Sequence, residues 1–142
     1  MSLLPTLSLI AGSFLLGAML FFASVTAPAI FKFLPEDARP PILHGIFPRY
    51  YSWCAIVTLG ATGLSFYAFN EPTIIFAAIT FGFIVLRYGL IPKIEKLREL
   101  RTTGDETARI QFAKLHRLSV FINLAQIVAT IWAMVLIVQI GV

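Results

Sequence analysis

Charged side chains are scarce in this chain: Asp, Glu, Lys and Arg make up 13% of its 142 residues, while 58% are hydrophobic. An ordinary soluble domain has about 25% charged residues. A globule of 15.7 kDa also has too little interior to bury this much apolar side chain. The mean hydropathy of +0.87 therefore excludes an ordinary soluble domain, a disordered chain and a nucleic-acid-binding domain. The remaining class is an integral membrane protein.

Cysteine and histidine are nearly absent as well. Cys54 is the only cysteine, so no intrachain disulfide can form. Together with His44 and His116 it provides too few ligands for a four-ligand zinc site. No phosphate-binding loop, G-x-S-x-G or H-E-x-x-H motif occurs. None of the seven carboxylates falls within a long apolar segment, which disfavours a proton relay across the bilayer. These absences lean away from an enzyme.

What the sequence does contain is a set of long segments without charge. Residues 1–31, 50–70 and 118–142 carry none, and residues 72–91 carry only Arg87. A helix needs about 20 apolar residues to cross the hydrocarbon core, and lipid forces such segments to be helical. We therefore predict an all-α, integral membrane four-helix bundle forming one domain over 1–142. Its spans are expected at about 4–27, 48–69, 74–92 and 117–140.

The first segment could instead be a cleaved signal peptide. Ala27-Pro28-Ala29 resembles a small-x-small cleavage site. However, Met1–Leu7 contains no Lys or Arg, and the apolar run is longer than the usual 7–15 residues. A membrane span is the better interpretation.

Prolines and turn residues predict the helix ends. Pro28 predicts an end or kink near Thr26, and further prolines predict an irregular loop over 28–47. Asn70-Glu71-Pro72 predicts a tight turn, and Thr103-x-x-Glu106 predicts a capping box that opens the last helix. The third and fourth helices are too long for the bilayer alone. We expect them to extend as a helical hairpin over about 93–116, with a bend at Pro92.

The basic residues predict the orientation. All eleven Lys and Arg fall in the first and third connections or at their margins. Positive charge stays on the cytoplasmic side. Loops 28–47 and 93–116 are therefore expected in the cytoplasm and both termini outside, on the periplasmic side. The net charge of +4 is then a basic belt attracted to anionic lipid headgroups rather than a nucleic-acid-binding surface.

Polar residues within the spans are the best functional clues, because lipid penalises them. His116, Ser119, Asn123, Gln126 and Thr130 recur at intervals of three and four, which places them on one face of the last helix. This face should point into the bundle, either as interhelical hydrogen bonds or as the wall of a polar site. Arg87 either extends to the interface or pairs inward with this face or the tyrosines of the second helix.

Small residues also recur in the spans. Gly60 and Gly63 lie near one face of the second helix, and Ser13 and Gly17 form a small-xxx-small step in the first. Such residues allow helices to approach closely, so we predict that they mediate packing.

Several motifs resemble a known family. Thr26-Ala-Pro-Ala-Ile-Phe-Lys-Phe-Leu-Pro35, Ile46-Phe-Pro-Arg-Tyr-Tyr51, Arg87-Tyr-Gly-Leu-Ile-Pro92 and Phe112-Ala-Lys-Leu-His-Arg-Leu-Ser119 resemble, in this order, the transmembrane protein 205-like family. The resemblance covers nearly the whole chain. It implies a small four-helix membrane protein built on a domain of unknown function, and supplies no reaction. The family pattern matches this chain at Phe47, Pro48, Tyr50, Arg87, Pro92, His116, Ser119 and Asn123.

From these residues we predict a polar pocket near the cytoplasmic edge of the bundle. Its candidate members are Tyr50, Arg87, His116, Ser119 and Asn123. We expect no catalytic residue and no metal ligand.

Three functions remain open. The favoured one is a structural or accessory bundle that forms a homo-oligomer or serves as a subunit of a larger membrane complex. The second is a haem or metal redox protein, with His44 and His116 as the two axial ligands of a b-type haem; no cofactor is otherwise evident. The third is a small-solute transporter that acts as an oligomer. More distantly, the four-span pattern is similar in architecture to the copper resistance D family and to membrane-bound protoporphyrinogen oxidase.

Overall fold

The chain folds into a bundle of long helices that lie side by side. The computed structural model describes residues 3–141, and every element among them is helical. The elements are α1 (Leu3–Phe21), a π-helical turn (Phe22–Thr26), α2 (Ala27–Phe33), α3 (Arg39–Ser65), α4 (Asn70–Val85), a second π-helical turn (Leu86–Leu90), α5 (Ile91–Thr102) and α6 (Glu106–Gly141). Three continuous helices are long and apolar enough to cross a membrane: Leu3–Phe33, Asn70–Thr102 and Glu106–Gly141. The predicted all-α membrane bundle is confirmed.

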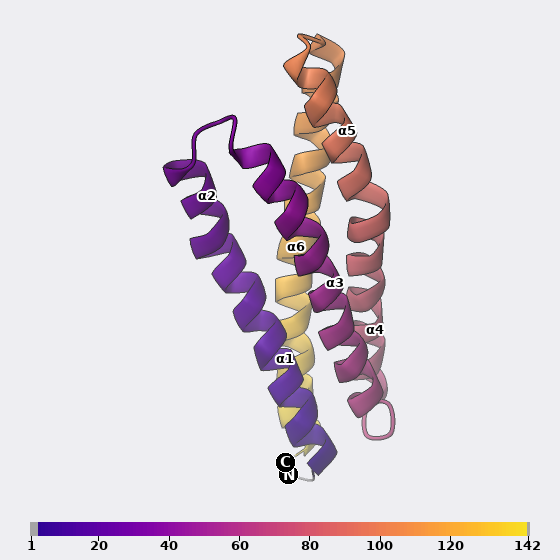
Figure 1. The fold of residues 1–142 in the computed structure, drawn as a ribbon. Helices are drawn as coiled ribbons and strands as arrows, with labels where there is room; N and C mark the ends of the chain where they lie inside the picture. Colours follow the sequence, from indigo (N-terminus) through magenta and orange to yellow (C-terminus); the bar gives the residue numbers. More distant parts are fainter. Residues whose placement is uncertain (1–2, 142) are drawn as a thin grey trace.

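The helices alternate in direction along the bundle. The start of α1 and the end of α6 lie at one end, and the α2–α3 turn and the α5–α6 turn lie at the other (Figure 1). The α5–α6 hairpin extends beyond the α2–α3 turn (Figure 1). α3 packs between α1 and α4, while α6 packs against α1, α4 and α5. The chain ends themselves, residues 1–2 and 142, lie outside the described part.

Pro28, with an expected helix end or kink, and Pro92, with an expected bend, both lie within continuous helices. The first helix does not end near Thr26 but continues to Phe33 through a π-helical turn, in which Ala27 N–H donates to Phe22 O. The second π-helical turn precedes Pro92, with Ile91 N–H donating to Leu86 O. Pro28 and Pro92 each follow such a turn by two residues. A wider turn gives the backbone a new hydrogen-bond register where proline has no N–H, so the helix continues.

The predicted irregular loop over 28–47 is wrong in extent, because only residues 34–38 lie outside helices. Pro40 and Pro41 lie in the first turn of α3, where the missing N–H groups would have no partner in the helix. Arg39 holds the connection together. Its Nε and Nη2 donate to Leu34 O at 3.0 Å and to Phe31 O at 2.8 Å, which satisfies carbonyls at the end of α2.

The two other predicted turns also need correction. Asn70-Glu71-Pro72 is the first turn of α4, and the reversal lies just before it, closed by Phe69 N–H donating to Ser65 O at 2.9 Å. The N-cap of α6 is Asp105 rather than Thr103: Asp105 Oδ1 accepts from Ala108 N–H at 3.1 Å. Gly104 reverses the chain with a φ of +87°, a conformation that glycine adopts without steric cost.

The core is a narrow apolar seam along the bundle axis. Among its fully buried side chains are Leu15, Met19, Tyr51, Phe76 and Phe83. Large apolar side chains also cover the outside, as at Ile56, Phe81 and Phe121, which are each about 70% exposed. A surface of this kind is costly in water and suits lipid.

Close helix contacts occur at other glycines than the ones predicted. A Cβ at Gly17, Gly60 or Gly63 would meet nothing within 4 Å, so these residues do not bring helices together in this bundle. A Cβ at Gly12 would lie 3.0 Å from Met134 Cγ of α6, and one at Gly82 would lie 2.7 Å from Gln126 Nε2. The tight contacts are therefore α1 with α6 and α4 with α6.

Gly82→Ala should destabilise the bundle, because the added methyl group displaces the Gln126 amide from its hydrogen bond to Ile79 O. We expect a loss of about 1 kcal/mol in the free energy of unfolding in mild detergent. Gly63→Ala is the matched control, and its added methyl group lies in open space. Equal stability of the two variants would show that the close α4–α6 approach has no energetic importance.

Candidate functional site

The polar face of α6 divides into two parts with different surroundings. The half nearer the C-terminus joins helices: Gln126 Nε2 donates to Ile79 O of α4 at 3.1 Å, and Thr130 Oγ1 donates back to Gln126 O at 2.7 Å. Both residues are buried. This part is interhelical hydrogen bonding, as expected of polar residues in a membrane bundle.

The half nearer the N-terminus, made of His116, Ser119 and Asn123, faces two cavities. Asn123 Nδ2 donates to the Tyr51 hydroxyl of α3 at 3.1 Å and to Ser119 O at 2.9 Å. Ser119 Oγ donates to His116 O at 2.7 Å. The buried Oδ1 of Asn123, like Oε1 of Gln126, has no hydrogen-bond partner among the described residues. This stretch therefore has hydrogen-bonding capacity that the bundle leaves unused.

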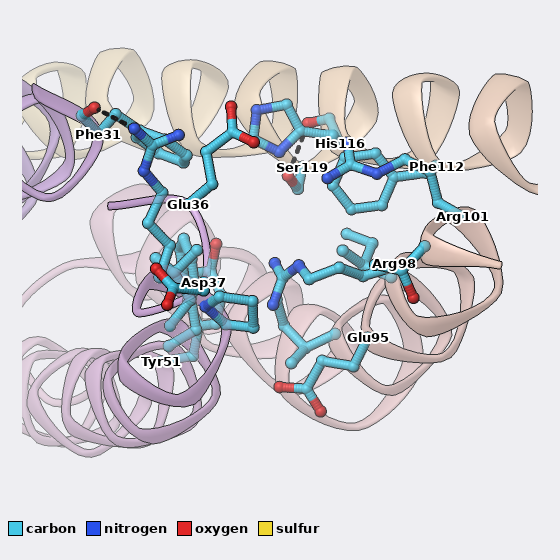
Figure 2. A pocket seen from close by; sticks show the side chains of 17 residues that line it. Phe31, Glu36, Asp37, Tyr51, Glu95, Arg98, Arg101, Phe112, His116 and Ser119 are labelled. Atoms are coloured by element: carbon cyan, nitrogen blue, oxygen red, sulfur yellow. Dashed lines mark hydrogen bonds between the residues drawn. The ribbon is translucent and has the colours of Figure 1, made fainter. Parts of the chain in front are cut away.

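The larger cavity, of about 660 Å³, lies between the α2–α3 connection and the α5–α6 hairpin, and Figure 2 shows the side chains that line it. The α2–α3 connection, the first half of α3, α5 and α6 all contribute to its wall. Its lining is Phe31, Glu36, Asp37, Arg39, Pro40, Leu43, Phe47, Tyr51, Ile91, Ile94, Glu95, Arg98, Arg101, Thr102, Phe112, His116 and Ser119. A volume of this size is typical of small-molecule sites.

Two arginines, Arg98 and Arg101, bring positive charge into this cavity. The guanidinium groups of Arg98 and Arg101 point into the space (Figure 2) and lie 5.8 Å and 4.6 Å from the ring centroid of Phe112. Within residues 3–141, no carboxylate lies within ion-pair distance of either group. Two cations thus share one aromatic ring, and neither is neutralised directly.

The other charges around the cavity are engaged elsewhere or stand at its rim. Arg39 caps α2, and Glu95 is paired with His44 through an Oε1–Nδ1 distance of 3.0 Å. Glu36 and Asp37 are exposed on the α2–α3 connection. None of these acids forms an ion pair with Arg98 or Arg101 among the described residues, although Glu95 acts on Arg98 from a greater distance.

His116 lies against the same aromatic ring, with the His116 and Phe112 centroids 6.0 Å apart and their planes 4° from parallel. It belongs to the hairpin, outside the expected spans. Burial and the neighbouring Arg98 both lower the pKa of His116. The lowered pKa favours the neutral imidazole, which presents one donor and one acceptor.

The smaller cavity, of about 280 Å³, adjoins the larger one and lies deeper along the bundle, between the α1–α2 helix and α6. Five residues line both: Phe31, Phe47, Tyr51, His116 and Ser119. The rest of its wall is mainly apolar: Met19, Phe22, Ala23, Ala27, Tyr50, Val120, Asn123, Leu124 and Ile127.

The rim of this smaller cavity is open on the outer face of the bundle. Phe31 of α2 and Val120 and Leu124 of α6 line the cavity, yet they are 47%, 45% and 52% exposed. The cavity therefore reaches the apolar outer surface between α2 and α6.

The structure brings four of the five candidate pocket residues to one cavity. Tyr50, His116, Ser119 and Asn123 all line the smaller one. Arg87 lines neither cavity: its Nε donates to Ser52 Oγ at 3.3 Å and its guanidinium lies 5.0 Å from the ring centroid of Tyr88. Arg87 therefore contacts α3 through Ser52, and not through the expected partners Tyr50, Tyr51, His116 or Asn123.

The two histidines proposed as haem ligands are placed differently from one another. His116 lines both cavities, whereas His44 is on the outer side of α3, paired with Glu95, and lines neither. Over residues 3–141, no group of three or more His, Cys, Asp or Glu side chains is arranged to hold a metal ion.

Sequence reasoning missed three residues of this site: Tyr51, Arg98 and Arg101. Tyr51 lies on the buried face of α3 together with Cys54, Thr58, Ala61 and Ser65, a helical period visible in the sequence. Arg98 and Arg101 are three residues apart, so they share a helix face. Neither spacing indicates that the two faces meet at Phe112, because that depends on how the hairpin folds back.

Comparison with known proteins shows the family. Residues 10–103 match the family described as Domain of unknown function (DUF4149), and the chain belongs to this family. It is similar to a protein of Aquifex aeolicus (strain VF5), described as an uncharacterized protein, with 30% identity over 122 residues, or 84% of this chain and 85% of that protein. No solved structure matches.

The Asn123–Tyr51 hydrogen bond should be measurable as a coupling between α6 and α3. In a double-mutant cycle with Asn123→Ala and Tyr51→Phe, we expect a coupling free energy of about 0.6–1 kcal/mol in thermal unfolding. Tyr88→Phe is the control, because Tyr88 is 71% exposed and makes no such bond. A coupling to Tyr51 no larger than that to Tyr88 would rule out this contact.

Proposed function

We propose that this DUF4149 protein is a four-span membrane protein without catalytic chemistry of its own, which serves as a structural or accessory subunit of a membrane assembly. The observation that supports this most directly is the bundle itself: three helices of membrane-spanning length and apolarity with an outward apolar surface. We also propose that the chain is related to the transmembrane protein 205-like family, since a small four-helix membrane protein is what that resemblance implies.

The fourth span of the proposal is α3. Its part from Tyr50 to Ser65 carries no charge, and Ile56 and Leu59 are 70% and 62% exposed on its outer face. α3 lies alongside α1 and α4 in the bundle. A helix packed between two membrane spans at the same depth has to cross with them, since the chain alternates in direction (Figure 1).

The proposed orientation follows from the basic residues. They all lie at the connections at one end of the bundle or in the helix turns near that end, including Lys32, Arg49, Lys93 and Arg117. Positive residues near span ends stay in the cytoplasm, so we place the hairpin there and both helix termini outside. The same belt would contact anionic headgroups of the inner leaflet.

A subunit role is supported by a shallow groove of about 490 Å³ on the outer face between α1 and α3. Its lining residues are Ile10, Ser13, Phe14, Gly17, Ala18 and Trp53. Since Gly17 meets nothing within the bundle, its small side chain leaves room for a helix of another chain. We propose a second copy of this protein as the occupant, which gives a homo-oligomer.

Cysteine labelling tests the number of spans and the orientation together. Cys54 is completely buried, so the native chain is the unlabelled control. With a membrane-impermeant maleimide on intact cells, Glu71→Cys should react, whereas Glu36→Cys and Thr103→Cys should react only after permeabilisation. Labelling of Glu36→Cys and Glu71→Cys from the same side would contradict α3 as a span. The reversed pattern would contradict the orientation.

The oligomer should be detectable by native mass spectrometry in mild detergent as a species of at least twice the chain mass. Gly17→Trp should fill the groove and shift this species to monomer, while Ala78→Trp on the lipid-exposed side of α4 should not. A purely monomeric native protein would refute self-association.

A further inference from the structure

We propose that the two adjoining cavities form one binding site for an anionic membrane lipid, with its headgroup at Arg98 and Arg101 and one acyl chain in the smaller cavity. Arg98 and Arg101 are members of the basic belt, but unlike Lys93 and Lys96 on the same helix they line a cavity. The proposed site requires that the protein is in a membrane but does not depend on the accessory role.

The first argument is the unneutralised charge. Arg98 is half-buried and Arg101 is exposed, and both lie over the same ring with no carboxylate in ion-pair contact among the described residues. The two like charges repel each other, and Glu95 offsets this only from beyond ion-pair distance. A phosphate between the guanidinium groups of Arg98 and Arg101 would accept hydrogen bonds from both, because the planar guanidinium group matches the geometry of phosphate oxygens.

The second argument is the polarity gradient from one cavity to the next. Charged residues of both signs line the upper cavity, the arginines together with Glu36, Asp37 and Glu95. Met19, Ala27 and Ile127 are among the apolar residues that line the deeper one, which has no charged residue in its wall among the described residues. Tyr51 and Ser119 line both and place hydroxyl groups at the junction. A ligand that fits both parts has a charged head, a polar middle and an apolar tail, which is the order of groups in a glycerophospholipid.

The third argument is access. The smaller cavity opens between α2 and α6, where Phe31, Val120 and Leu124 are exposed. α2 stands apart from α6 at this level, whereas α1 packs against α6 lower down (Figure 1). A lipid could enter sideways with its chain still in the apolar layer, so its tail would never pass through water. A soluble anion would need only the upper cavity.

Binding of defined ligands to delipidated protein in mild detergent tests the proposal by native mass spectrometry. The probes are phosphatidylglycerol, phosphatidylcholine and glycerol 3-phosphate. We expect one tightly retained phosphatidylglycerol per chain, and weaker binding of the zwitterionic lipid. The Arg98→Gln/Arg101→Gln variant should bind phosphatidylglycerol about tenfold or more weakly, because it loses charge-assisted hydrogen bonds.

The matched control for charge is Lys93→Gln/Lys96→Gln. These residues are exposed on the same helix and line neither cavity. Their removal takes away the same charge, so binding should change by less than about twofold if the site is specific. An equal loss in both double variants would overturn the proposal in favour of the surface belt.

The tail is tested by Ala27→Trp, which fills the smaller cavity, with Ala78→Trp as the control on the lipid-exposed side of α4. Ala27→Trp should weaken phosphatidylglycerol binding and leave glycerol 3-phosphate binding unchanged. If glycerol 3-phosphate binds as tightly as the lipid and Ala27→Trp has no effect, the site serves a soluble anion and the proposal is wrong. Val120→Trp, on the opposite wall, repeats this test should Ala27→Trp fail to fold. Because the assay uses detergent, its outcome is independent of membrane orientation and of self-association.

Discussion

The structure depends on one constraint: in an apolar surrounding, each backbone N–H and C=O needs a partner within the chain. This constraint explains why the long helices continue through their prolines. At Pro28 and Pro92 the chain widens into a π-helical turn and resumes the helix, so that a missing N–H does not open the backbone to lipid. The first and third helices thereby reach 31 and 33 residues. The end of α2 follows the same rule, since Arg39 supplies donors to two of its carbonyls.

Side chains obey the same constraint, and most do so locally. Thr58, Thr80 and Thr130 donate to carbonyls four residues earlier in their own helices. Hydrogen bonds between helices are then made by only a few longer polar side chains. Gln126 reaches Ile79 O because Gly82 leaves room for its amide. The bundle is thus tightest where α6 meets α4. Each of the two parts of the polar face of α6 has one buried amide oxygen without a partner among the described residues, Oε1 of Gln126 and Oδ1 of Asn123.

The end of α6 nearer the hairpin combines two neighbouring arginines with a buried amide oxygen that has no partner within residues 3–141. Arg98 and Arg101 lie over one ring without a carboxylate in contact, and Asn123 Oδ1 is buried without a partner among the described residues. Burial lowers the pKa of Arg98, which indicates that its charge is less well solvated than at a free surface. The proposed lipid site is therefore placed at this end of the molecule.

Much of the architecture follows from the sequence alone. Charge-free segments long enough for a bilayer predict the class, the all-helical fold and the hairpin, since lipid admits few other structures. The period of His116, Ser119, Asn123, Gln126 and Thr130 predicts one inward polar face, because a helix has a known number of residues per turn. The positions at which helices begin and end were less predictable. Pro28, Pro40 and Pro72 each signal a break, but tertiary packing and π-helical turns keep them inside helices.

Only the tertiary structure decided which faces meet. Tyr50 and Tyr51 are equally good partners for Asn123 by sequence, and the rotation of α3 selects Tyr51 for the hydrogen bond. Arg87 belongs to the same set by motif, yet its helix turns it toward Ser52. Arg98, Arg101 and Phe112 come together because α5 and α6 fold back on each other at Gly104. A sequence determines how each helix divides into faces, whereas their rotation and depth depend on side-chain packing between segments distant in the chain.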